Sequence, residues 1–234
     1  MGKFRIISYE SQRFKDRQEA GQLLADELAE YRRRGVVVLG IPRGGIIVAR
    51  ELARQLDADL DIVLSRKLRT PGHWELAMGS VSEDGKLFLN ETVVKELGIK
   101  QAFIEKEKVV QMAEIARRTE LIRGVLPKVP LKDRLVIVTD DGVATGATTQ
   151  AALWSVRQEH PQKLIAAIPV GPEDTVKRLT ESVDEMLCLR SPPLFVAVGQ
   201  FYIRFEQVED EDVLKVLKEE YERKHGKMPK AAGV

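Results

Sequence analysis

Short runs of aliphatic and β-branched residues alternate with helical patterns along most of this chain, and this alternation limits the possible folds more than any other feature. The runs at 36–40 and 135–139 are apolar at almost every position, which is typical of strands buried on both faces. Helical patterns separate such runs, and parallel strands need a crossover of this kind to join them. The alternation therefore predicts an α/β fold with a doubly wound, mainly parallel sheet.

The elements follow from hydrophobic periodicity and from the glycines and prolines that end each segment. A β-hairpin is predicted around 83–85. The segment 65–79 is polar and contains Pro71 and Gly72, so it is predicted to be irregular, as is the aromatic segment 191–208. Strands are predicted at 36–40, 60–64, 135–139, 163–170 and 185–189, and helices at 17–34, 46–56, 91–123 with a break near Gly98, 149–159, 173–181 and 210–225.

Length and composition limit the organisation and the partners. A chain of 234 residues that is 44% hydrophobic is large enough for one domain, here 1–234, with a core at about 17–190. The net charge of +1 provides no general field for nucleic acid or anionic membranes, so neither is an expected partner. The single cysteine, Cys188, cannot form an internal disulfide, and no apolar run approaches the roughly 20 residues of a membrane span. These features predict a soluble, cytoplasmic protein.

Two glycine-bearing turns, at 40–45 and 142–146, each follow a strand and open a helix. Because the carboxyl ends of parallel strands lie at one edge of a sheet, we expect the two turns to meet there. That edge is where ligands bind in such folds.

The second turn carries the strongest chemical signal in the chain. Asp140 and Asp141 end the strand, and two neighbouring carboxylates would repel each other without a partner such as a cis-diol or a metal ion. The segment 144–148 then opens a helix, where free backbone N–H groups and the Thr145 and Thr148 hydroxyls can hold a phosphate. A ribose 5-phosphate has both groups at this spacing. The alternative is a plain strand exit followed by a helix cap.

The whole segment 136–148 closely resembles the motif with which type I phosphoribosyltransferases bind 5-phosphoribosyl 1-pyrophosphate (PRPP). The resemblance covers about 35–189 in element order, and it implies the fold of that family, with a small C-terminal hood at about 191–225 and extra helices. It also implies that Asp140 and Asp141 hold the ribose hydroxyls, as catalytic residues. The substrate-binding residues that it implies in this motif are Asp140, Asp141, Gly142, Val143, Ala144, Thr145, Gly146, Ala147 and Thr148.

The first turn occupies the position at which this family receives pyrophosphate. Successive N–H groups at Gly44 and Gly45 can form an anion nest, and Arg43 can pair with a phosphate as a catalytic group. The resemblance also implies a cis peptide bond near Arg43. Neither turn has the dinucleotide pattern G-x-G-x-x-G or the P-loop pattern, which argues against those two classes.

Further contacts are predicted on either side of these turns. Arg66 and Lys67, in the basic cluster after the second strand, are candidates for pyrophosphate binding, with a solvated charge run as the equal alternative. The segment 69–78 matches the position of the family's mobile catalytic loop. Phe201 and Tyr202 are candidates for stacking on the acceptor base, although hood aromatics can equally be core residues.

The resemblance implies a phosphoribosyltransferase that transfers the phosphoribosyl group of PRPP to a purine-like or pyrimidine-like base. Magnesium is the implied cofactor, held mainly through PRPP, with Asp140 and Asp141 as the candidate protein ligands. The alternatives are a regulatory protein that binds PRPP or a nucleotide without turnover, and an enzyme of the same fold with altered chemistry. The segments 101–123 and 210–225 exceed a minimal domain and are candidates for an oligomer interface.

Overall fold

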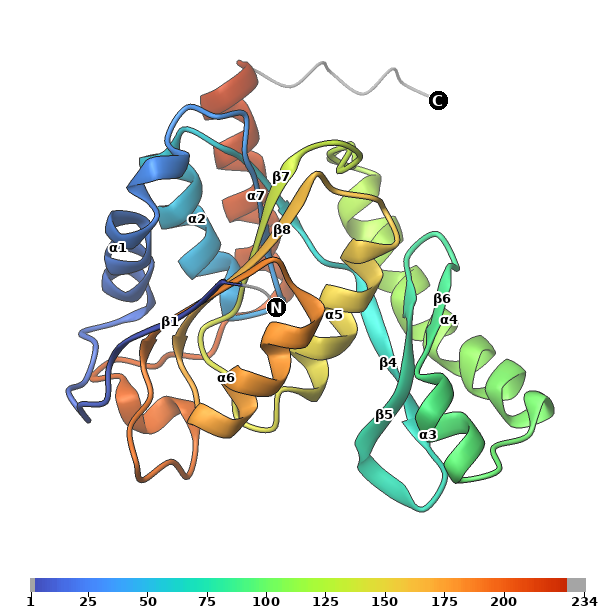
Figure 1. Cartoon of the computed structure of the whole chain (residues 1–234). Helices are drawn as coiled ribbons and strands as arrows, with labels where there is room; N and C mark the ends of the chain where they lie inside the picture. Colours follow the sequence, from blue (N-terminus) through green and yellow to red (C-terminus); the bar gives the residue numbers. More distant parts are fainter. Residues whose placement is uncertain (1–2, 227–234) are drawn as a thin grey trace.

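A six-stranded, all-parallel sheet forms the centre of the molecule (Figure 1). The computed structural model describes residues 3–226, without the side chains of residues 73–75, so both ends of the predicted domain lie outside the described residues. The strand order is β1-β9-β8-β7-β2-β3, which confirms the predicted parallel α/β sheet. The strands are β1 (Lys3–Ser8), β2 (Val37–Gly40), β3 (Asp59–Ile62), β7 (Leu135–Thr139), β8 (Lys163–Val170) and β9 (Glu185–Arg190).

Helices cover both faces of this sheet (Figure 1). One face is covered by α1 (Arg17–Glu27) and α2 (Gly45–Leu56), and the other by α5 (Ala147–Arg157) and α6 (Glu173–Leu179). The C-terminal helix α7 (Asp210–His225) packs beside α2 and β3. Within residues 3–226, the helices lack the length and apolar character that crossing a bilayer would require.

The central strands bury both faces because they are apolar at consecutive positions. Ile137 belongs to the same buried cluster as Leu24 of α1 and Leu52 of α2, whereas its neighbour Val138 belongs to the cluster that contains Leu153 of α5. Successive side chains of a strand point to opposite faces, so one apolar run supplies two cores. This arrangement fixes the carboxyl ends of β2 and β7 side by side, with Gly40 paired to Thr139.

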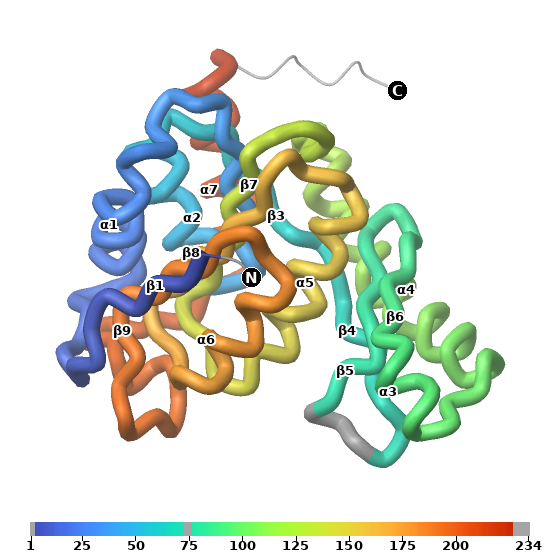
Figure 2. Tube along the Cα trace, viewed as in Figure 1, coloured from blue at the N-terminus to red at the C-terminus, as the bar shows by residue number. Residues whose placement is uncertain are grey.

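A smaller antiparallel unit packs against α5, beside the main sheet (Figure 2). Its core is formed by Leu68, Met78, Val81, Ile104 and Ile115. The unit joins α5 through a stacked pair of rings, Phe88 and Trp154, whose centroids lie 4.5 Å apart. Its elements are β4 (Ser65–Thr70), β5 (His73–Ser82), β6 (Leu87–Leu89), α3 (Glu91–Glu96) and α4 (Gln101–Arg123).

The prediction that residues 65–79 are irregular is wrong, because β4 and β5 form a hairpin there. Charged residues dominate β4, yet Leu68 and Thr70 are buried, so the strand is amphipathic with a period of two. Pro71 and Gly72 do not interrupt the whole segment. They form only the tight turn between the strands, where Gly72 has a φ of +72°. The hairpin around 83–85 and the helix break near Gly98 are confirmed.

Other elements also differ from the sequence prediction. The helix predicted at 17–34 ends at Glu27, and a 3-10 turn, η1 (Ala29–Tyr31), follows it. The predicted helix 173–181 likewise ends at Leu179 and continues as η2 (Thr180–Ser182). The strand β1 has no counterpart in the prediction, because its sequence KFRIIS carries little of the pattern of a buried strand and it lies at the sheet edge. The hood segment contains one 3-10 turn, η3 (Val198–Phe201).

Cys188 lies within β9 and has no exposed surface. Burial raises the pKa of its thiol to about 12, so very little of the reactive thiolate is present at neutral pH. We expect iodoacetamide to leave Cys188 unmodified in the native protein and to alkylate it fully in urea, as measured by mass spectrometry. Rapid alkylation under conditions in which circular dichroism shows a native fold would contradict this placement.

Candidate active site

The two glycine-bearing turns meet at one edge of the sheet, as the sequence predicts. The amide of Ile41 donates to the carbonyl of Thr139 at 2.9 Å, which joins the ends of β2 and β7. A Cβ atom on Gly45 would lie 2.8 Å from the Cα of Asp140, so a larger residue would push the two turns apart. The close packing of the first turn on the acid pair therefore depends on glycine.

Arg43 lies in the first turn, and the peptide bond between Pro42 and Arg43 is cis, as expected from the resemblance. Its guanidinium Nη1 donates to Oε2 of Glu209, just before α7, at 2.8 Å. An exposed ion pair of this kind contributes only about 0–1 kcal/mol, so a phosphate could replace Glu209 at little cost. The pyrophosphate contact of Arg43 stays a prediction.

Asp140 and Asp141 lie at the end of β7 with their carboxylates largely withdrawn from solvent. The Oδ1 atom of Asp140 accepts from the amide of Asp141 at 2.8 Å, and Oδ2 of Asp141 accepts from Nε of Arg17 at 2.8 Å. Burial and the neighbouring Asp141 carboxylate raise the pKa of Asp140 well above its usual range. Burial also raises the pKa of Asp141, and the Arg17 guanidinium opposes that shift. Hydrogen bonds donated by a ligand would therefore stabilise the charged form of this acid pair.

The phosphate-type loop at 144–148 is braced from behind by α6. The hydroxyl of Thr175 donates to the carbonyl of Ala144 at 2.9 Å, and Nη2 of Arg178 donates to the carbonyl of Thr145 at 2.5 Å. Gly146 has a φ of +75° and precedes the first residue of α5. These contacts take up carbonyl groups of the loop. The N–H groups at the start of a helix are not used within the helix and favour an anion.

A cavity of about 870 Å³ lies beside this loop, lined by Thr145, Gly146 and Ala147. Arg178 of α6 and Leu76 of the β4–β5 hairpin line it as well. The segment predicted to be a mobile loop therefore borders the phosphate-type loop.

A second cavity, of about 180 Å³, is strongly basic. Arg66, Lys67, Arg69 and Arg118 line it together with Thr148, and Pro42 of the first turn lines it as well. Nε of Arg66 donates to Oε1 of Gln111, a buried residue of α4, at 3.1 Å. The structure thus brings Arg66 and Lys67 next to the end of the predicted phosphate loop. Four cations around so small a space favour a multiply charged anion.

Some predicted residues do not reach either cavity. Asp140 and Asp141 line neither of the two, and Val143 is a core residue whose amide donates to the carbonyl of Val170 at 2.9 Å. Gly142 is buried as well, and a Cβ there would lie 2.6 Å from Val198. The last three residues of the loop line different cavities. Thr148 lines the basic cavity, and Gly146 and Ala147 line the cavity of about 870 Å³.

The predicted hood aromatics lie in the core. Phe201 and Tyr202 are each 2% exposed, and the Tyr202 ring packs between Phe14 and Phe205 at centroid distances of 5.3 and 5.1 Å. The Tyr202 hydroxyl donates to the carbonyl of Asp141 at 2.5 Å, so it supports the acid pair from within. Phe205 is 40% exposed and is the ring of this group that a ligand can approach.

Sequence reasoning missed four residues around the site: Arg17, Arg118, Thr175 and Arg178. Each lies within or next to a helix whose charged and polar residues look like an ordinary solvated face. Nothing local in the sequence distinguishes them. Only packing places them beside the motif.

Comparison with known proteins supports the resemblance. Residues 12–206 match the family model described as a phosphoribosyl transferase domain. Two Mycobacterium tuberculosis proteins, from strains CDC 1551 / Oshkosh and H37Rv, are each 43% identical to this chain over 204 residues, and both carry the name "Putative phosphoribosyl transferase". The match covers 87% of this chain but 46% of theirs, so the chain spans about half the length of these curated relatives.

A solved structure shares the fold closely. The crystal structure of TT1426 from Thermus thermophilus is 44% identical and superposes with a TM-score of 0.85, covering 89% of this chain and 99% of that one. The family match spans both glycine-bearing turns, the acid pair and the phosphate-type loop. The chain therefore belongs to the phosphoribosyltransferase family, as the 136–148 segment predicts.

Proposed function

We propose that this protein binds PRPP and transfers its 5-phosphoribosyl group to a nitrogen of a purine-like or pyrimidine-like base, releasing pyrophosphate. One observation carries the proposal: an acid pair lies at a sheet edge with a phosphate-type loop directly after it and a basic cavity beside that loop. A ribose that carries a phosphate at one end and a pyrophosphate at the other matches these three parts.

In this mechanism each part of the chain has one task. Asp140 and Asp141 accept hydrogen bonds from the ribose hydroxyls, and the amides at 145–148 hold the 5-phosphate. The bond between C1 and the pyrophosphate oxygen breaks as the base nitrogen bonds to C1, and the proton of that nitrogen passes to the departing pyrophosphate. Positive charge develops on the ribose and negative charge on the leaving group. Arg66, Lys67 and Arg118 line the cavity that would receive that negative charge.

Magnesium fits this site mainly through the substrate. Its preferred ligands are oxygens, and Asp140 and Asp141 are the carboxylates available at the end of β7. One carboxylate oxygen of Asp140 already accepts from the Asp141 amide, and one of Asp141 already accepts from Arg17. The phosphate oxygens of PRPP would therefore supply most of the remaining ligands. When bound, the ion would neutralise charge on the departing pyrophosphate.

The β4–β5 hairpin is the candidate for a cover over the bound sugar. Its residues Leu76 and Ala77 line the cavity beside the phosphate-type loop, and Arg69 lines the basic cavity. A hairpin that closes over both cavities would keep water from hydrolysing PRPP. The acceptor would then enter beside Phe205, which is 40% exposed. Because Arg17 and Tyr202 already lie against the Phe205 ring, a base would contact only the part of the ring that they leave open.

The test is pyrophosphate release from PRPP in the presence of a panel of purine and pyrimidine bases. Release that depends on one base supports transfer. A regulatory role, in which the protein binds PRPP or a nucleotide without turnover, is the second candidate, favoured by the ion pair that already engages Arg43 with Glu209. PRPP binding by calorimetry without base-dependent release would favour that role. Absence of binding to both PRPP and nucleotides would contradict both candidates.

Neighbouring arginines of α4 allow a matched test of the basic cavity. Arg117 and Arg118 both contact Asp210, at 3.1 and 3.7 Å, but only Arg118 lines the cavity. We expect Arg118→Ala to weaken pyrophosphate binding by about tenfold, the value of one charge-assisted hydrogen bond. Arg117→Ala should leave it unchanged. Calorimetry with pyrophosphate measures both, and equal losses would contradict the role of this cavity.

A further inference from the structure

Arg17 is buried, although arginine is seldom withdrawn from water unless it is paired. It is the first residue of α1, and 124 positions separate it from the acid that it contacts. Its Nε donates to Oδ2 of Asp141 at 2.8 Å, and its Nη1 donates to the carbonyl of Glu206 at 2.7 Å. The guanidinium carbon also lies 3.9 Å from the centre of the Phe205 ring. One side chain therefore connects α1, the end of β7 and the segment 202–206.

A second set of contacts holds the same segment against the acid pair. The Tyr202 hydroxyl donates to the carbonyl of Asp141, and the Tyr202 ring stacks on Phe205. The first turn also packs closely against this pair. A Cβ atom on Gly44 would lie only 2.9 Å from Nε of Arg17, so the turn leaves no room for a larger residue there. Asp141 is thus held by three separate parts of the chain, with Arg17 and the first turn against its carboxylate and Tyr202 on its backbone carbonyl.

The charges around Asp141 also indicate that Arg17 stabilises its carboxylate. Asp140 and Asp141 are adjacent carboxylates largely withdrawn from water, and burial together with the Asp141 carboxylate raises the pKa of Asp140. Arg17 is the cation that lowers the pKa of both acids, against the larger effect of burial. A carboxylate fixed in this way is ready to accept hydrogen bonds from a sugar without first reorganising.

We propose that Arg17 is a positioning residue, which holds the Asp141 carboxylate in the orientation that receives the ribose hydroxyls and ties it to the segment 202–206. This inference rests on the proposed function, since it takes Asp141 as a ribose contact. The opposite role, in which Arg17 occupies the place of the sugar, is disfavoured by geometry. Leaving Asp141 would strip the guanidinium of its contacts with Glu206 and Phe205 as well.

The first experiment is a double-mutant cycle on PRPP affinity, measured by calorimetry. We expect Arg17→Gln to raise the Kd about 10- to 100-fold, as for the loss of a charge-assisted pair. In an Asp141→Asn background, the same Arg17→Gln change should have little further effect, because Arg17 acts through that carboxylate. Additive losses would overturn the proposal, and so would tighter binding by Arg17→Gln, which would mark Arg17 as a competitor of the sugar.

A buried arginine elsewhere supplies the matched control. Arg123 has a side chain 14% exposed, close to the 10% of Arg17, and it pairs with Asp61 and Glu83 at 2.8 Å each. Arg123→Gln should lower stability with no change in PRPP affinity. A wild-type protein that binds no PRPP would overturn the proposed function and this inference together, whereas additive losses in a binding-competent protein overturn the inference alone.

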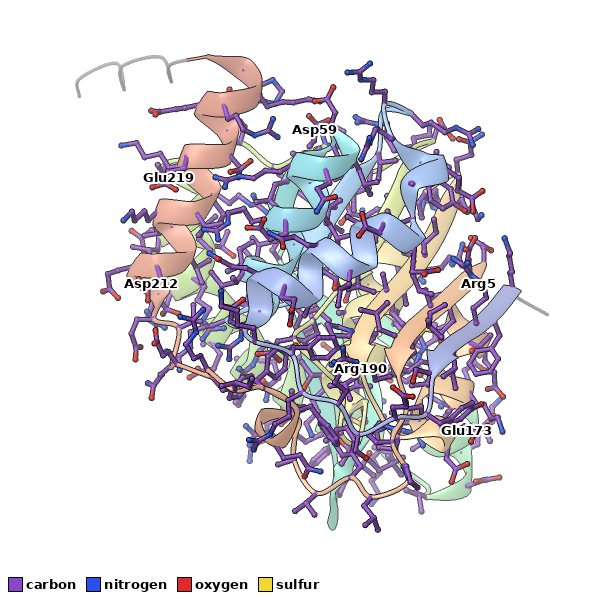
Figure 3. The ribbon with its side chains drawn as sticks, turned by 90° about the vertical axis from the view of Figure 1, so that its left-hand side faces the viewer. Arg5, Asp59, Glu173, Arg190, Asp212 and Glu219 are labelled. Atoms are coloured by element: carbon purple, nitrogen blue, oxygen red, sulfur yellow. The ribbon has the colours of Figure 1, made fainter. Side chains whose placement is uncertain are left out.

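A chemical-rescue experiment separates positioning from folding. Arg17 lines a cavity of about 490 Å³ that also reaches Asp212 and Glu219 of α7, both visible along that helix in Figure 3. Added guanidinium can therefore enter from this side. We expect millimolar guanidinium chloride to restore PRPP affinity to Arg17→Ala, with sodium chloride as the ionic control. Failure of guanidinium to do so in a folded variant would contradict the proposal.

A milder variant keeps the proposal testable if the changes at Arg17 prevent folding. Phe205→Leu leaves the Arg17–Asp141 pair but removes the ring beneath the guanidinium, and Phe205 is partly exposed. We expect a two- to fivefold increase in the Kd for PRPP, consistent with about 0.5–1 kcal/mol for such a contact. Unchanged affinity in Phe205→Leu, with Arg17→Gln unfolded, would overturn the proposal.

Discussion

The double variant Asp140→Asn, Asp141→Asn is expected to lose PRPP affinity by at least about 100-fold while remaining folded. Each carboxylate would contribute charge-assisted hydrogen bonds to the ribose, worth about 1.5–3 kcal/mol apiece. Asparagine preserves the shape and the Oδ1 acceptor that the Asp141 amide uses, so the turn itself is retained. Removal of two neighbouring charges also relieves their repulsion, which offsets part of the stability lost when the ion pair with Arg17 is weakened.

A second adjacent acid pair provides the control. Asp184 and Glu185 lie at the start of β9, which places them at the opposite edge of the parallel sheet, and both are engaged in ion pairs. The double change Asp184→Asn, Glu185→Gln removes the same charge and should lower stability without affecting PRPP affinity. Calorimetry gives the affinities and circular dichroism the fold. Unchanged affinity in the folded Asp140/Asp141 variant would remove the basis of the proposed function.

The variant Gly146→Val is expected to abolish binding of the 5-phosphate. Gly146 has a φ of +75°, a conformation that a β-branched residue adopts only with strain. A Cβ there would also lie 2.7 Å from Cγ2 of Thr175, the residue that braces the loop through the carbonyl of Ala144. The loop would have to shift, and its amides would no longer converge on one anion. Binding of ribose 5-phosphate, followed by calorimetry, should fall below detection.

Gly98 allows the strain to be separated from the loss of the site. It has a φ of +57° between α3 and α4, and a Cβ there would meet nothing within 4 Å. Gly98→Val should therefore carry a comparable backbone penalty, on the order of 1–2 kcal/mol, and leave ribose 5-phosphate affinity unchanged. Full binding by Gly146→Val would show that the phosphate does not lie on this loop.

Several elements could be predicted closely because their signals are local. The strands at 135–139 and 163–170 and the helix at 210–225 appear with the predicted boundaries. Each contains a continuous apolar run or a clear helical period, and each is bounded by glycine, proline or charged residues. The strands β1 and β4 lacked such signals, since an edge strand or a hairpin buries only some of its side chains.

The candidate site likewise has a part that local sequence predicts and a part that it does not. The acid pair and the phosphate-type loop are contiguous in sequence, so one strand followed by one helix brings their backbone groups together in any fold of this class. The contribution of Phe201 and Tyr202 could not be judged in this way. An aromatic residue in an irregular segment gives the same sequence signal whether it lines a pocket or packs in the core, as Phe201 and Tyr202 do.

The order of the residues by itself determined the alternating strands and helices, the edge at which both turns lie, and the family to which the chain belongs. Only the tertiary structure decided that Arg17 pairs with Asp141 and that Arg118 faces the first turn. It also decided that Arg178 braces the loop. The physical reason is distance along the chain. Neighbouring residues share a backbone whose geometry is known in advance, whereas residues separated by dozens of positions meet only when burial of apolar side chains has fixed how helices pack on the sheet.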